Sequence, residues 1–122
     1  MALASNNLRA VNRTRNVALV TRGEIADSWW TRLRGLLGHA PLHPGEGVLL
    51  RGEKAIHTVG MTFAIDVLFL DSAGRIVHLI PAMGPLRASR FVNRAANVLE
   101  LYAGTIADTG TALGDQIDFE LG

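Results

Sequence analysis

The sequence predicts a mainly β (α+β) fold: a small closed or nearly closed antiparallel β-barrel of about seven short strands, with one α-helix packed at one opening. Short apolar runs bounded by turn residues recur along the chain, and only one segment has clear helical spacing. At 122 residues, with 48% apolar and 19% charged residues, the chain has the size and balance of one globular domain. We therefore expect a single domain over residues 8–121, with residues 1–7 flexible.

The strands are predicted from runs of apolar and β-branched residues that end at Gly, Pro, Asn or Asp. They lie at residues 8–11, 17–21, 47–51, 65–70, 75–80, 97–102 and 116–121. The run 65–70 is almost continuously apolar, which indicates burial on both faces of the sheet. Residues 71–74 favour a turn, because Asp71 can bond back to the backbone and Gly74 tolerates positive φ. Residues 65–80 are therefore predicted to form an antiparallel hairpin.

The helix is predicted at residues 28–37. Asp27 or Ser28 can accept the free N–H groups of its first turn, and Gly38 can end it. The apolar residues follow at the spacing of one helical face: Trp29, Trp30, Leu33, Leu36 and Leu37. We expect Leu33, Leu36 and Leu37 to pack against the sheet.

The composition excludes several kinds of chemistry. The chain has no cysteine, which excludes disulfides, thiolate nucleophiles, zinc–thiolate sites and iron–sulfur clusters. Pro41 lies between His39 and His43, so these two do not project from one helical face, and we expect no metal site. The phosphate-binding glycine motifs of nucleotide enzymes are also missing, and we expect no cofactor.

The location of the protein is predicted from its most apolar segments. Residues 1–9 have no basic stretch that leads into an apolar core, so no signal peptide is expected. The most apolar stretch, residues 59–70, is interrupted by Asp66 and is too short to span a bilayer. The sequence therefore favours a cytoplasmic protein with no membrane partner.

Charge is unevenly distributed, although the formal net charge of +1 argues against a general nucleic-acid binder. Residues 1–22 carry four arginines and no acid: Arg9, Arg13, Arg15 and Arg22. Residues 101–122 carry four acids and no base: Asp108, Asp115, Asp118 and Glu120. The favoured interpretation is that the two ends are neighbouring strands whose charges pair across the sheet. A basic arm for nucleic acid would need tighter clustering of the arginines.

The order and spacing of several motifs resemble one known family. The motifs lie at residues 34–38 (RGLLG), 56–61 (IHTVGM), 65–71 (IDVLFLD), 98–104 (VLELYAG) and 114–115 (GD). Together they resemble the domain of unknown function 192 family over roughly residues 8–121, with Leu37 where many relatives carry Met. The resemblance implies a compact β-barrel-like fold with one helix. It implies no reaction, because the family has no established activity, and a fold does not fix a function.

The first candidate site is a rim at the start of the apolar strand. His57 precedes that strand and can act as a base, a ligand or a hydrogen-bond donor, and Asp66 is the one charge within it. A His57–Asp66 pair, with Thr58 and Met61 nearby and with Asp115 or Glu100 as a further carboxylate, would form a ligand-binding site. The alternative is structural: Asp66 caps backbone N–H groups of residues 57–63, and His57 is a satisfied scaffold residue.

Three functions follow from these residues. The favoured one is a non-catalytic domain that binds a small ligand or a partner segment at His57, Thr58, Met61, Asp66 and Asp115. The second is a small hydrolase that uses His57 and Asp66 as an acid–base pair, although no nucleophile motif accompanies them. The third is anion or nucleic-acid binding through Arg87, Arg90 and Arg94, which would share one face if their segment were helical.

Overall fold

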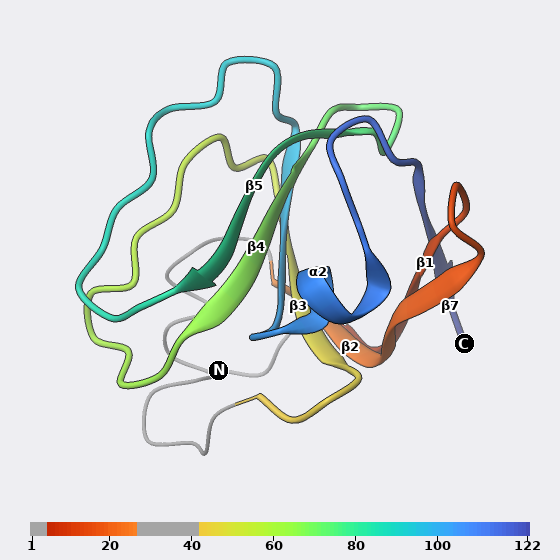
Figure 1. Ribbon diagram of the computed structural model, residues 1–122, viewed down its shortest axis with the longest axis horizontal. Coiled ribbons are helices and arrows are strands. Elements are labelled where there is room, and N and C mark those ends of the chain that lie inside the picture. Colours follow the sequence, from red (N-terminus) through yellow and green to blue (C-terminus); the bar gives the residue numbers. More distant parts are fainter. Residues whose placement is uncertain (1–4, 27–41) are drawn as a thin grey trace.

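The computed structural model describes residues 5–26 and 42–122. Seven strands form one sheet in the order β5-β4-β6-β3-β2-β1-β7 (Figure 1). Their bounds are β1 Ser5–Asn12, β2 Val17–Ala26, β3 Glu46–Arg51, β4 Ile65–Leu70, β5 Ile76–Met83, β6 Asn97–Tyr102 and β7 Ile117–Leu121. The described residues contain one helix, α2, at Thr105–Thr109. The predicted mainly β fold is confirmed. The helix predicted at residues 28–37 lies outside the described residues.

The sheet curls but does not close into a full barrel. Its edge strands, β5 and β7, touch at one end only, where Arg75 and Gln116 form an isolated bridge. There Ile117 N donates to Gly74 O at 2.9 Å, and Ile76 N donates to Asp115 O at 3.0 Å. Away from this contact, α2 and the loop that follows it lie between the two edges (Figure 1). The helix therefore fills part of the gap between β5 and β7, the two strands that a closed barrel would join.

One strand pair departs from the expected antiparallel arrangement. β2 and β3 run parallel, with Arg22 opposite Glu46 and Ala26 opposite Leu50. A parallel pair needs a connection of about a dozen residues or more, and the number of residues between Ala26 and Glu46 meets that need. The other ladders of the sheet are antiparallel.

The predicted hairpin of β4 and β5 is confirmed, with its turn at residues 71–74. Asp71 Oδ1 accepts hydrogen bonds from Ala73 N at 3.0 Å and from Arg75 N at 2.9 Å, as expected for an Asp at this position. Gly74 has φ 86°, and a Cβ there would lie 2.5 Å from Ile117 O. Only glycine fits this turn, because β7 passes directly over it.

Each face of the sheet supports its own core. On one face, Leu68, Leu70 and Leu99 pack with Ile106 of α2. On the other face, Val67, Phe69 and Val98 pack with residues of two long loops, Ile56, Met61 and Val92. β4 contributes to both cores and is buried throughout, as its continuous apolar run predicts.

The charges at the two ends pair as the sequence predicts. β1 and β7 are antiparallel neighbours, with Arg9 opposite Glu120 in register. Arg9 lies 3.8 Å from Glu120, and Arg13 lies 2.9 Å from Asp118. These exposed pairs contribute little stability each, but they match the two strands electrostatically.

Candidate functional site

Two long loops pair to form an irregular ribbon on the face of the sheet opposite α2. We call residues 54–59 together with residues 84–92 the loop ribbon. Its backbone bonds run from Val92 N to Lys54 O (2.7 Å), from Ser89 N to Ile56 O (2.9 Å) and from Thr58 N to Arg87 O (2.8 Å). His57 and Ala88 face each other as an isolated antiparallel bridge. Gly84 and Pro85 follow the end of β5 at Met83, and beyond them the chain pairs locally without joining the main sheet.

The inner face of the ribbon is structural. Ile56, Thr58 and Val92 are buried against the sheet. Thr58 Oγ1 donates to Gly84 O at 2.7 Å and accepts from Arg87 N at 2.9 Å, so it fixes the two halves of the ribbon to each other. Met61 is 5% exposed and belongs to the same core. Of the residues predicted for the rim, Thr58 therefore belongs to the inner face of the ribbon and Met61 to the core.

The outer face of the ribbon is apolar and exposed. Val59 is 52% exposed, Leu86 is 75% exposed and Phe91 is 63% exposed. His57 is half-buried, lies opposite the exposed Ala88, and its Nδ1 accepts a 3.4 Å hydrogen bond from Val59 N. Isolated exposed apolar residues are ordinary, so the feature that distinguishes this ribbon is that it carries three of them.

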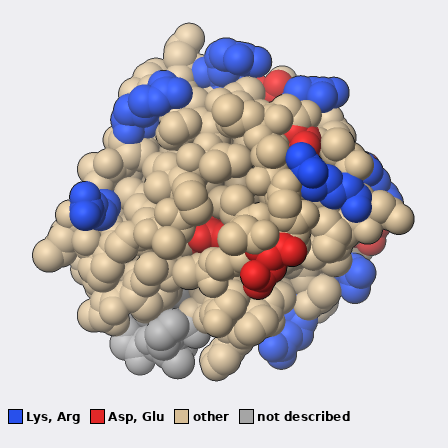
Figure 2. All heavy atoms as spheres, in the orientation of Figure 1, with Lys and Arg blue, Asp and Glu red and all other residues tan. Residues whose placement is uncertain are grey.

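Basic side chains lie on the same ribbon and just after it. Arg87, Arg90 and Arg94 are exposed, and within the described part of the chain none of them forms an ion pair. The arginines near the start of the chain each pair with an acid, so these three differ from them. On the upper left, over the segment 84–96, basic side chains appear without an acidic one (Figure 2). The segment contains no helix, so the predicted alignment on one helical face does not occur.

Leu86 has an unfavourable backbone conformation, with φ 58°. This left-handed region is uncommon for a residue with a large side chain and disfavours it by about 1–2 kcal/mol. Leu86 N donates to Thr58 O at 3.4 Å, so the ribbon pairing holds the turn in place. The strain directs an apolar side chain toward solvent.

The charge of Arg90 affects the pKa of His78. It lies on β5 with its ring centroid 5.3 Å from that of Phe69. Burial lowers the pKa of His78, and the charge of Arg90 lowers it further. The electrostatic effect of Arg90 therefore reaches the sheet beneath the ribbon.

Asp66 does not pair with His57. Its carboxylate is 1% exposed and accepts from Ala82 N at 2.8 Å, Gly104 N at 3.1 Å and Ile106 N at 2.8 Å. Asp66 thus caps the start of α2 and holds a bulge of β5, where Ala82 has φ 50°. The structural alternative expected Asp66 to cap backbone N–H groups of residues 57–63. Asp66 does bond backbone N–H groups, but those groups belong to other segments of the chain. The acid–base pair of the hydrolase hypothesis is not formed.

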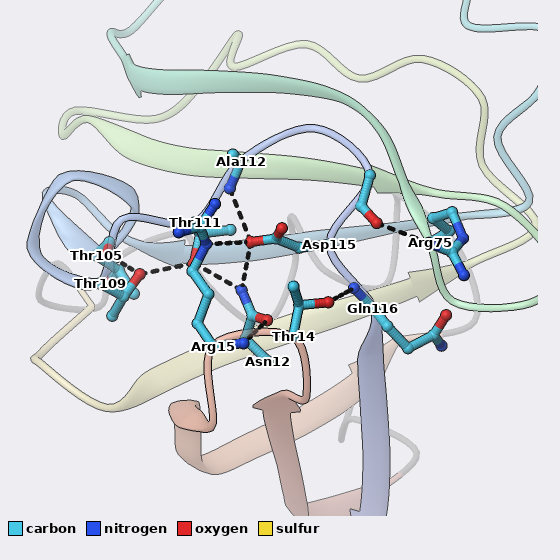
Figure 3. A network of polar contacts seen from close by, with 11 residues as sticks. Asn12, Thr14, Arg15, Arg75, Thr105, Thr109, Thr111, Ala112, Asp115 and Gln116 are labelled. Carbon is cyan, nitrogen blue, oxygen red and sulfur yellow. Dashed lines mark hydrogen bonds and ion pairs between the residues drawn. The ribbon is translucent and has the colours of Figure 1, made fainter.

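Asp115 lies in a separate polar network between the β1–β2 turn and the loop after α2 (Figure 3). Its Oδ2 accepts from Asn12 Nδ2 at 2.9 Å, Arg15 Nε at 2.6 Å and Ala112 N at 3.0 Å. Burial alone would raise the pKa of Asp115, but the hydrogen bonds from Asn12, Arg15 and Ala112 hold it below its ordinary value. The structure does not bring Asp115 to His57, and the network joins strands rather than lining the ribbon.

Glu100 also lies apart from the ribbon surface. It is wholly buried at the centre of the sheet, opposite Val48 on β3 and Val67 on β4. Within residues 5–26 and 42–122, no group of three or more His, Asp or Glu side chains converges as a metal site requires. Among those residues, no helix is long and apolar enough to cross a membrane.

The sequence predicted His57, Arg87 and Arg90 as candidate site residues, and the structure places them on the ribbon, with Arg94 just after it; the exposed apolar residues were not predicted. Nothing in the local pattern shows that Val59, Leu86 and Phe91 are exposed, because each lies in a segment without regular period. The available signal was the mixture of apolar and basic residues that follows Pro81 and Pro85.

The chain matches the family DUF192, described as "Uncharacterized ACR, COG1430", over residues 10–119. The chain belongs to the DUF192 family. A UPF0127 protein from Thermococcus sibiricus is 31% identical over 115 residues, which cover 91% of this chain and 74% of that relative. The function of the DUF192 family is uncharacterised, so membership assigns no reaction.

Two crystal structures are similar to this DUF192 chain. A protein from Sinorhizobium meliloti, provisionally described as a transcription regulator, has a TM-score of 0.78 and 26% identity. The alignment covers 98% of this chain and 96% of that one. A protein of unknown function from Novosphingobium aromaticivorans has a TM-score of 0.75 over 97% of this chain and 93% of its own. It is 17% identical and shows the fold alone.

Proposed function

We propose that this DUF192 domain is a non-catalytic binding module and that the outer face of the loop ribbon receives a protein partner. Val59, Leu86 and Phe91 would supply the apolar contacts, and the exposed Arg87, Arg90 and Arg94 lie close to them in the chain. Arginine and aromatic residues are enriched in protein–protein interfaces, whereas lysine is depleted. Two residues of the predicted site, His57 and Thr58, lie on the ribbon. Thr58 is buried, so a partner would contact His57. We also propose that the protein is cytoplasmic, a location with which the lack of cysteine is compatible.

The strained and exposed position of Leu86 is the main support for this proposal. A loop that faced only water would be more stable with glycine at φ 58°, because glycine adopts this region without strain and exposes no apolar side chain. Strained backbone tends to occur at functional sites, where it positions a side chain for a contact. A leucine that is 75% exposed at such a position is therefore best explained by a contact with another molecule.

A nucleic acid is the second candidate partner. Arg87, Arg90 and Arg94 form no ion pair with the described residues, and the Sinorhizobium meliloti relative is provisionally described as a transcription regulator. Contacts to phosphates would make binding fall steeply as the salt concentration rises. Two of the three exposed apolar residues, Val59 and Leu86, favour a protein instead, because only Phe91 has a planar face on which a base can stack.

The test uses a photo-reactive benzophenone amino acid at single positions in the native host. We expect a discrete protein adduct from positions 86 and 91. Leu113, which is 64% exposed on the loop after α2, is the matched control and should give none. The double substitution Arg87→Glu and Arg90→Glu should abolish the adduct at position 86. Equal adducts at positions 86 and 113, or none at 86 and 91, would contradict the proposal.

A further inference from the structure

We infer that the partner binds as an extended, acidic segment of a protein chain that adds a strand to the open edge of the loop ribbon at Ala88. This inference rests on the proposed function and specifies its chemistry. Two independent observations carry it: the hydrogen-bonding groups of the ribbon edge and the charge that surrounds them.

The edge of the ribbon presents backbone groups to solvent. Thr58 N bonds Arg87 O, and Ser89 N bonds Ile56 O, on either side of the pair of His57 and Ala88. In an antiparallel ladder, this pattern makes His57 and Ala88 a non-hydrogen-bonded pair. The N–H and C=O of Ala88 therefore point away from residues 54–59, toward the outside of the ribbon.

These outward groups have no partner in the part of the chain that the structure describes. Neither the N–H nor the C=O of the exposed Ala88 forms a hydrogen bond there, and the same holds for the N–H of Arg90, two residues further on. Figure 1 shows residues 84–96 on the outer left rim of the molecule, with residues 52–63 inside them. An extended peptide can bond to such an edge at every second residue.

The charge around this edge selects the kind of segment. Arg87 and Arg90 flank Ala88, and between Asp71 and Glu100 the chain contains no acid. A basic segment would be repelled there, whereas carboxylates would form charge-assisted hydrogen bonds with the guanidinium groups. Leu86 and Phe91, at the two ends of the edge, offer contacts for apolar side chains that alternate with the acidic ones.

The experiment measures the binding of a short synthetic peptide in which aspartate alternates with leucine. The expected result is saturable binding in NMR titration, with new protection of the Ala88 and Arg90 amides from hydrogen exchange. The same peptide with methyl groups on alternate backbone nitrogens keeps its side chains but loses donors, and it should bind at least about tenfold more weakly. The version with lysine in place of aspartate should not bind.

Matched protein variants test the two observations separately. Ala88→Pro removes the N–H donor at the edge and should weaken binding by about tenfold. If that variant does not fold, the methylated peptide on the native protein decides the same point. Arg87→Gln with Arg90→Gln should weaken binding by about tenfold, whereas Arg9→Gln with Arg22→Gln, which removes the same charge elsewhere, should leave it unchanged.

Several results would overturn the inference. Equal binding of the methylated peptide, or binding without protection at Ala88 and Arg90, would show contact through side chains without strand addition. Binding of oligothymidylate but not of the acidic peptide would assign the edge to nucleic acid. Protection of Ala88 that depends on protein concentration alone would assign it to a second copy of this chain. If the methylated peptide bound equally well, or if binding gave no protection at Ala88 and Arg90, while positions 86 and 91 still gave adducts, only strand addition would be refuted. The proposed ribbon surface would remain.

Discussion

Replacing Asp66 with alanine tests how much of the fold depends on one buried carboxylate. Asp66 accepts three backbone hydrogen bonds, from Ala82, Gly104 and Ile106, and it is 1% exposed. Each hydrogen bond to a charged group contributes about 1.5–3 kcal/mol, and a buried donor left unsatisfied loses about 1–3 kcal/mol. Water can reach part of the site after truncation, so the sum is smaller than three separate losses. We expect Asp66→Ala to lower the free energy of unfolding by about 3–5 kcal/mol.

Asp71 provides a matched control on the same strand–turn unit. Its Oδ1 also accepts two backbone hydrogen bonds, from Ala73 and Arg75, but these lie at the surface, where water replaces them. Asp71→Ala should therefore lose less than about 1 kcal/mol. Asp66→Asn, which keeps one acceptor oxygen in place, should fall between the two variants.

Urea unfolding followed by far-UV circular dichroism measures all of these variants on one scale. The midpoint of Asp66→Ala should fall while the denaturant slope stays constant, since the unfolded state is unchanged. If Asp66→Ala lost no more than Asp71→Ala, the three backbone bonds would not stabilise the bulge and α2, and the assignment of Asp66 to the scaffold would fail. A stable variant that no longer bound a partner would instead return Asp66 to the functional surface.

Three further outcomes follow from the structure. The pKa of Asp115 is lowered in the folded state, so the stability that its carboxylate contributes is present above the unfolded pKa, near 3.8, and is lost as the pH falls. Asp115→Asn should therefore lower the free energy of unfolding by about 2–3 kcal/mol at pH 7. Urea unfolding at a series of pH values should show the difference between the variant and the native protein shrinking in acid. Arg90→Gln removes the second cause of the lowered pKa of His78, so NMR titration should show that pKa closer to 6.5, although burial keeps it below that value. An unchanged pKa would show that the charge of Arg90 does not act on His78. His57→Ala should change the unfolding free energy by less than about 1 kcal/mol, as measured by urea unfolding, because His57 lies on the outer face of the ribbon; a loss of about 1–3 kcal/mol would make it a scaffold residue.

Local chemistry explains the parts of the fold that the sequence predicts correctly. The hairpin of β4 and β5 follows from a continuous apolar run and from Asp71 and Gly74 within a few residues. The pairing of β1 with β7 follows from the opposite charges of the two ends, which Arg13 and Asp118 illustrate. Both signals lie in the residues that make the contact.

Long-range contacts explain what the sequence could not predict. The partners of Asp66 lie 16, 38 and 40 residues away, so nothing near Asp66 identifies them. α2 has only five residues, too few to show a helical period, and its first turn is capped by a distant carboxylate, that of Asp66. The loop ribbon forms because Thr58 bonds across to Gly84 and Arg87, and the exposure of Leu86 depends on that pairing.

The Asp115 network has a consequence for the order in which the protein is completed. Asn12 and Asp115 are 103 residues apart, yet they join the first hairpin to the loop that leads into the last strand. Contacts of such long separation form late and slow the folding of a domain. A chain still being synthesised presents β1 with one neighbour, β2, and an open edge on its other side until residues 111–121 emerge. During that interval the unpaired edge is a template for pairing with another chain, so a fragment that stops before residue 111 should aggregate where the full chain remains dispersed.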